Sequence, residues 1–168
     1  MLHINFLAVL VAALIPMIIG FIWYNPKVLG TAWMKAAGMT EEKMKGANMA
    51  LIFGLTFVFS FFVAVIMNFV TIHQSGMQSS LLTQGVDLND ISTPIGAYFA
   101  DYMVRYGNNF RTFKHGALHG TITGIMLALP IIGVNALFER KGFKYIAINA
   151  GFWIVCLALM GGVVCGWQ

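Results

Sequence analysis

Four long apolar stretches alternate with polar segments along the chain. None of the four contains Asp, Glu, Lys or Arg. A helix of about 20 mostly apolar residues spans the hydrocarbon core of a bilayer. The pattern therefore predicts an all-α fold, an integral membrane four-helix bundle formed as a single domain by residues 1–168. Its transmembrane helices are expected at about 4–23, 47–70, 116–138 and 145–166.

Aromatic residues mark the end of the first predicted span, which Pro16 is expected to interrupt. Trp23 and Tyr24 close this span, and Trp33 follows in segment 30–37, which we predict to be a short interfacial helix. Amphipathic rings of this kind settle at the level of the lipid headgroups. We therefore predict that Trp23, Tyr24 and Trp33 are interface anchors.

A helix start is indicated at Thr40, because a capping residue is followed there by Glu41 and Glu42. We expect the second helix to begin at this point. If it runs to Val70, its length of about 45 Å exceeds the hydrocarbon core of about 30 Å. Its first turns must then protrude from the membrane or tilt.

The longest polar stretch, 71–114, separates the second and third spans. Its Gly, Ser, Gln and Asn content argues against a fifth crossing. Thr93 and Pro94 have the order of a helix start, and apolar residues then recur every three or four positions. We predict a long extramembrane loop that contains a short amphipathic helix at about 94–106.

The composition supports the membrane assignment and excludes several classes of protein. Hydrophobic residues make up 59% of the chain and charged residues only 10%, whereas soluble domains are roughly 25% charged. A soluble enzyme, a disordered chain and a nucleic-acid-binding domain are excluded. The predicted partner is therefore the lipid bilayer, and no nucleic acid is expected.

The net charge of +4 is explained by membrane topology. By the positive-inside rule, the side richer in Lys and Arg faces the cytoplasm. Three basic residues lie on one side, Arg105, Arg111 and Lys114, and seven lie in the connections on the other: Lys27, Lys35, Lys43, Lys45, Arg140, Lys141 and Lys144. We predict a multi-pass protein of the cell (inner) membrane, with both termini and the long loop outside, periplasmic in a diderm bacterium.

Two stretches carry a resemblance to a known family. One is Gly-Phe-Ile-Trp-Tyr-Asn-Pro at 20–26, which continues through 30–35 and 38–40, and the other is His-Gly-Ala-Leu-His-Gly at 115–120. Together they resemble the DUF1761 family of small bacterial integral membrane proteins, over nearly the whole chain. The resemblance implies a membrane bundle of uncharacterised function, with no established catalytic residues to carry over.

Glycines recur every four residues in the third span, at Gly116, Gly120 and Gly124. Small residues at this spacing line one helix face and let another backbone approach closely, as in a glycine zipper. We predict that this face packs against a helix, either within the bundle or in a homodimer. Ala147 and Gly151 in the fourth span offer a matching surface.

Four histidines are expected at one face of the membrane. His115 and His119 are four residues apart at the start of span three, and the threading brings His3 and His73 to the same, outer side. Such residues can bind a metal ion, relay protons or hydrogen-bond a neighbouring helix. We predict a metal site at His3, His73, His115 and His119; in the alternative, His3 and His73 are interfacial and His119 donates to a backbone carbonyl or an Asn.

Two functions follow from these patterns. The first is a non-enzymatic accessory subunit that packs through its glycine faces, in a homo-oligomer or a larger membrane complex. The alternative is a binding or permeation module that holds a metal, lipid or quinone-like ligand at the histidine cluster. No catalytic residue is predicted, because an enzyme using His115 and His119 lacks the carboxylate partners that acid–base chemistry normally needs.

Overall fold

The computed structural model describes residues 4–82 and 86–168, and the regular elements in these ranges are helical. Four helical segments are long and apolar enough to cross a membrane, which confirms the predicted all-α membrane bundle. They are α1 (Phe6–Trp23), α4 (Met49–Thr71), the third span (Phe113–Phe138) and α9 (Phe143–Gly166). The third span consists of α7 (Phe113–Thr123), a π-helical turn η2 (Gly124–Ala128) and α8 (Leu129–Phe138).

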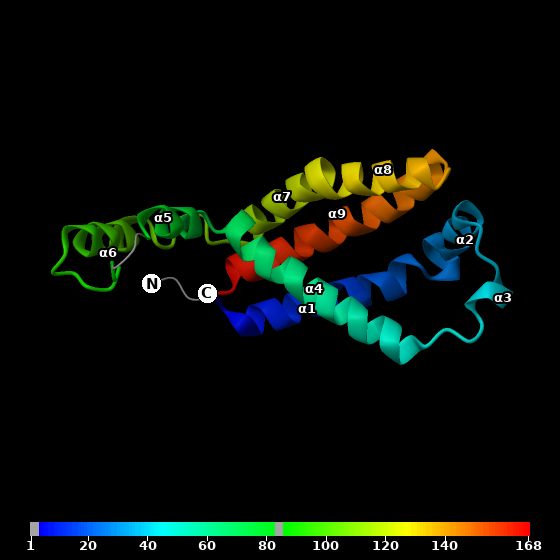
Figure 1. Ribbon diagram of the computed structural model, residues 1–168, viewed down its shortest axis with the longest axis horizontal. Helices are drawn as coiled ribbons and strands as arrows, with labels where there is room; N and C mark the ends of the chain where they lie inside the picture. The colour runs from blue at the N-terminus through cyan, green and yellow to red at the C-terminus, as the bar shows by residue number, and fades with distance from the viewer. Residues whose placement is uncertain (1–3, 83–85) are drawn as a thin grey trace.

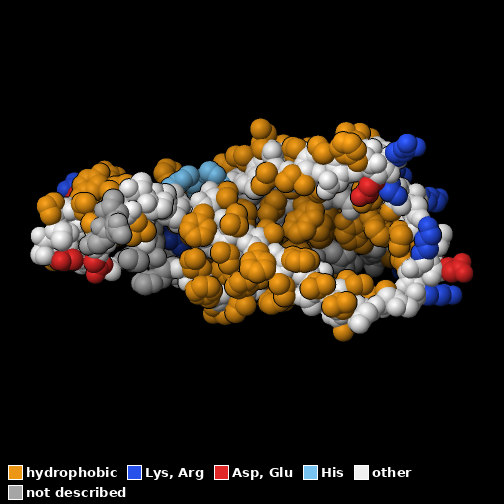
Figure 2. All heavy atoms as spheres, in the orientation of Figure 1, with side chains coloured by type: hydrophobic (Ala, Val, Ile, Leu, Met, Phe, Trp, Pro, Cys, Tyr) orange, Lys and Arg blue, Asp and Glu red, His pale blue; other side chains and the backbone are white. Residues whose placement is uncertain are grey.

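Helix α9 is the most buried of the four spans and contacts each of the others. Figure 1 shows it running beside the third span, with α1 and α4 crossing each other on its other side. Hydrophobic side chains cover much of the bundle surface in the view of Figure 2, as expected for helices that face lipid. The core is built from α1, α4 and α9: Val9, Ala12, Ala64, Met67, Phe152, Cys156, Leu157, Met160 and Val164.

Neither proline inside a span ends its helix. Pro16 is buried within α1, which continues to Trp23, so the predicted interruption is wrong. In a bilayer core there is no water to satisfy free backbone groups, so the chain keeps its helical hydrogen bonds on both sides of a proline. In the third span, η2 lies just before Pro130. A wider turn at this place relieves the clash between the proline ring and the preceding turn.

The connection from α1 to α4 consists of three short elements, η1 (Pro26–Gly30), α2 (Thr31–Ala37) and α3 (Glu41–Met44). Thr40 caps α3 by accepting a hydrogen bond from the Lys43 amide. The prediction that the second helix begins at Thr40 is wrong. Helix α4 begins at Met49 and is capped by Asn48. The chain turns at Gly46, whose φ of +82° is easily reached only by glycine. The acidic residues therefore belong to a separate helical turn.

The three predicted interface anchors tie α1 and α2 to the start of α9. The Trp23 indole Nε1 donates to the carbonyl of Ile148 at 3.1 Å, and the Tyr24 hydroxyl donates to Asn149 Oδ1 at 3.0 Å. The Trp33 ring lies edge-on against Tyr24, with 5.4 Å between centroids. These contacts give the three rings a packing role, and their placement at the headgroup level stays a prediction.

The polar segment after α4 contains two helices, α5 (His73–Leu81) and α6 (Pro94–Tyr106). Helix α6 coincides with the predicted amphipathic helix and is capped by Thr93, which accepts from the Gly96 amide. Helix α5 was not predicted, because its polar sequence has almost no apolar periodicity. Figure 1 shows α5 and α6 extending beyond the end of the bundle at which α9 ends. We call α5 and α6 the arm.

Candidate metal centre

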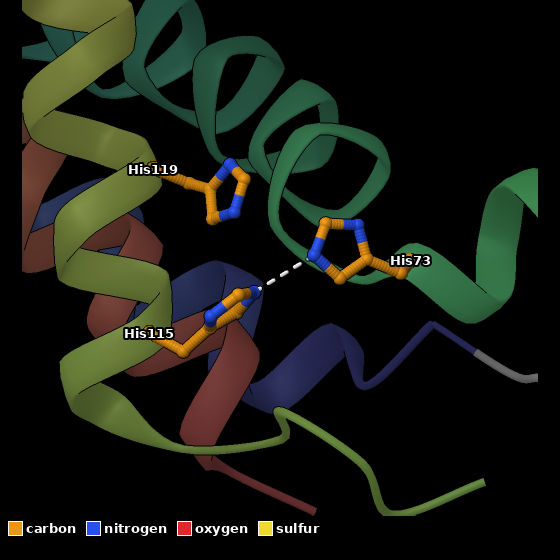
Figure 3. Close-up of side chains that lie close together, drawn as sticks. All are labelled: His73, His115 and His119. Carbon is orange, nitrogen blue, oxygen red and sulfur yellow. Dashed lines mark hydrogen bonds between the residues drawn. The ribbon is translucent and has the colours of Figure 1, made fainter. Parts of the chain in front are cut away.

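Three histidines meet where the arm joins the bundle. His73 is the first residue of α5, and His115 and His119 lie in the first turns of α7. The Nε2 atoms of His73 and His115 are 2.9 Å apart, although 42 residues separate the two in sequence. One potential ligand nitrogen from each of the three rings lies within 4.8 Å of the others. In Figure 3 the rings from α7 point toward the ring of His73.

The position of His115 and His119 follows from the start of α7. Thr112 caps this helix by accepting a hydrogen bond from the His115 amide at 3.2 Å. Residues four apart lie on the same helix face, so both imidazoles point to the same side, with 4.5 Å between their centroids. The rings of both lie within 5.0 Å of His73.

A buried glutamine fixes the backbone beside His73. Gln74 is only 2% exposed, and its side-chain Nε2 donates to the carbonyls of Tyr106 at 2.7 Å and Asn109 at 2.9 Å. These bonds tie the start of α5 to the segment that leads from α6 into α7. His73 is thereby held opposite the two histidines of α7.

Phe110 covers the cluster from the segment before α7. Its φ of +62° is unusual for a bulky side chain, and conformations of this kind occur in turns and cluster at functional sites. Its ring stacks on His115 at a centroid distance of 5.0 Å and lies edge-on to His73 at 5.9 Å. Sequence reasoning missed both Phe110 and Gln74, because neither residue type signals a left-handed backbone or a contact between distant segments.

The donor set fits a transition metal ion. Imidazole nitrogen is a preferred ligand of zinc, copper, iron and nickel. In a tetrahedral zinc site with bonds of about 2.0 Å, two ligand nitrogens are about 3.3 Å apart. The Nε2 atoms of His73 and His115 are 2.9 Å apart, and no pair of ligand atoms exceeds 4.8 Å, so side-chain rotations that change these distances by up to about 1.5 Å suffice. Three protein ligands leave a fourth position open, as in catalytic zinc sites.

The match to known proteins is at the level of the family. A model described as "Protein of unknown function (DUF1761)" matches residues 7–165. The chain belongs to the DUF1761 family. Comparisons with curated proteins and with solved structures give no match. The three converging histidines of this DUF1761 protein lie within the matched range. His3, the fourth predicted ligand, precedes that range and lies outside the described residues.

The residues next to the centre in sequence are basic. Arg111 and Lys114 precede His115, and the Arg111 Nε donates to the carbonyl of Cys165 at 3.0 Å, at the end of α9. Asp101, which would be the nearest candidate for acid–base chemistry if the arm folded back, instead pairs with Arg105 at 2.9 Å on the exposed face of α6. Among the described residues, the cluster of the DUF1761 protein therefore consists of imidazoles alone.

The glycine face of the third span packs against α9 of the same chain. Gly116 lies against Gly161, Gly120 against Leu157, and Gly124 against Ile154, so the matching surface on α9 runs from Ile154 to Gly161. The predicted surface at Ala147 and Gly151 is wrong. Helices joined by a short turn run antiparallel, so the first residues of the third span meet the last turns of α9. Ala147 is exposed, and Gly151 faces Trp23.

Small residues in α9 give a signal that sequence reasoning missed. Ala158, Gly162 and Gly166 recur every four residues, and Gly161 precedes Cys165 by the same interval. This spacing is typical of close helix packing in membranes. Gly162 and Gly166 both contact Phe113 at the start of α7, so the packing of α9 also fixes the turn from which the two histidines of α7 project.

Proposed function

We propose that this DUF1761 protein is a membrane metal-binding protein, which holds one divalent transition metal ion through His73, His115 and His119. The observation that supports this proposal is the convergence of three imidazoles from two separate elements, with two Nε2 atoms 2.9 Å apart. Intramembrane and juxtamembrane ionisable groups are costly to place together and mark functional sites. The ion would lie where the arm meets the bundle.

The glycine stripe gives little support to the accessory subunit, the first of the two functions predicted from the sequence. Gly116, Gly120 and Gly124 are buried against α9 of the same chain. A face that is already covered has no area left for a partner helix. Assembly into a homo-oligomer or a larger complex stays a prediction, and it would have to use another surface.

Metal content tests the proposal directly. The protein is reconstituted in nanodiscs, equilibrated with Zn²⁺, desalted and analysed by elemental mass spectrometry. We expect one Zn²⁺ per chain, because three imidazoles and one open position complete a tetrahedral site. The triple variant His73→Ala, His115→Ala, His119→Ala is expected to retain none while keeping the helical circular dichroism of the parent. Equal Zn²⁺ content in both proteins would overturn the proposal.

The same proposal places the metal centre on the outer side of the cell membrane. In Figure 2, Lys and Arg gather mostly at the end of the bundle opposite the histidines, and basic connections face the cytoplasm. We expect a membrane-impermeant maleimide to label Ser80→Cys in the arm of intact cells. Lys45→Cys should react only after lysis. The native cysteines, Cys156 and Cys165, are buried and provide a low background. The reverse labelling pattern would place the centre in the cytoplasm.

A further inference from the structure

An apolar groove opens between α4 and the third span. Its volume is about 480 Å³, and residues of three of the four spans line it, among them Ile66, Met67, Thr123, Leu127 and Trp153. Ligand pockets typically have volumes of about 300–1,000 Å³. Figure 1 shows α4 diverging from α7 and α8 away from the histidine end. The groove lies within segments long and apolar enough to cross a membrane, so it opens toward lipid.

Residues on both walls of the groove lie close in sequence to the histidines. Thr123 is four residues after His119, about 6 Å along the helix axis, and its hydroxyl donates to the His119 carbonyl at 2.8 Å. On the other wall, Met67 in α4 precedes His73 by six residues. Because residues four apart lie on the same helix face, a ligand at the histidines would lie on the face of α7 that ends at the groove-lining Thr123.

The chemistry at the two ends of this path differs. Apart from Thr123, the side chains that line the groove are apolar, so the groove suits a hydrocarbon chain. At the other end, a metal held by three neutral imidazoles keeps its positive charge and one open position. The complementary ligand has an anionic oxygen at the end of an apolar chain.

We infer that the centre binds a long-chain fatty acid, whose carboxylate completes the coordination of the metal ion and whose acyl chain lies in the groove. This inference rests on the proposed metal centre. A fatty acid fits the short path because its carboxylate is attached directly to the chain. In a phospholipid, the glycerol backbone separates the phosphate from the acyl chains, which places the chain further from the metal.

Spectroscopy of the Co²⁺-loaded protein tests the inference. The protein is placed in phosphatidylcholine nanodiscs, loaded with Co²⁺, and titrated with palmitate or with hexadecanol, which has the same chain but no charge. We expect palmitate to shift the visible absorption bands of Co²⁺, because a carboxylate replaces water as fourth ligand. Hexadecanol should leave them unchanged. An equal response to both compounds, or to neither, would overturn the inference.

Substitutions in the groove test the acyl-chain site separately from the metal site. Leu127→Trp and Ile131→Trp, at two groove-lining and half-exposed positions, should each weaken the palmitate response at least tenfold and leave Co²⁺ affinity unchanged. Met126→Trp is the matched control, because Met126 is 71% exposed and does not line the groove. If both groove variants respond like the parent, the acyl chain does not lie in the groove and the inference fails.

The outcomes also distinguish this inference from the proposal on which it rests. Absence of Co²⁺ binding would overturn both. Co²⁺ binding without a palmitate response would leave the metal centre standing and remove the fatty acid. If nanodiscs containing phosphatidylglycerol produce the spectral shift before palmitate is added, the ligand is a phospholipid phosphate and the fatty-acid inference is wrong.

Discussion

Replacing Gly120 with Ala should lower the free energy of unfolding by about 3 kcal/mol. Overpacking of a core usually costs 1–3 kcal/mol, and the added Cβ would overlap the backbone of Leu157 and Ala158. Backbone atoms cannot rotate away as side chains do, so α7 and α9 would have to separate. Separation also removes the dispersion contacts that hold membrane helices together. Unfolding in detergent, followed by circular dichroism at 222 nm, measures the loss.

Gly133→Ala is the matched control, because this glycine lies in the same span with open space around it. Alanine has a higher helix propensity than glycine by up to about 1 kcal/mol, so stability should stay the same or rise. If Gly120→Ala were as stable as Gly133→Ala, the close contact between α7 and α9 would be wrong. The three histidines of the metal centre would then have no fixed arrangement.

Each single substitution of His73, His115 or His119 by Ala should weaken Zn²⁺ binding by more than about 100-fold. Loss of a residue that only supports a ligand costs 10–100-fold, and loss of a ligand costs more. Competition with a chromophoric chelator measures the dissociation constants in nanodiscs. Lys114→Ala is the control, since removing a neighbouring positive charge should leave the affinity unchanged or slightly higher. The same titration of His3→Ala measures whether the fourth predicted ligand contributes.

Zn²⁺ affinity of the parent protein should also fall as the pH falls. Imidazole binds a metal ion only in its unprotonated form, so protons compete for the same nitrogen atoms. Between pH 7.5 and 5.5 we expect the dissociation constant to rise more than about tenfold. If one of the three single variants kept the parent's affinity and pH dependence, that histidine would not be a ligand.

The fold could be predicted largely from local properties of the chain. The bilayer requires every backbone group to be satisfied within a helix, so long uncharged apolar stretches suffice to locate α1, α4, the third span and α9. The amphipathic helix at 94–106 carried its own cap and apolar spacing. Two local elements were not predicted correctly. Helix α5 has no apolar period to reveal it, and the helix start at Thr40 belongs to the short helix α3, which ends before Gly46.

The site could be predicted only in part. The spacing of His115 and His119 indicated a shared helix face, and the threading of the spans brought His73 to the same side. However, residues on the same side of the membrane can lie far apart, so this prediction does not establish that their nitrogen atoms approach one another. The 2.9 Å approach of His73 to His115 depends on the Gln74 bonds across the arm and on the backbone of Phe110, neither of which is encoded in a local pattern.

The sequence by itself determined the number of candidate spans, the family, the glycine stripe and the shared helix face of His115 and His119, because these depend on composition and spacing along single helices. Only the tertiary structure decided which part of α9 covers the glycines, where the groove opens and that three imidazoles face one another. These features depend on the crossing of helices and on contacts between residues far apart in sequence, such as His73 and His115, which are 42 positions apart. Such contacts form only when the whole chain is packed.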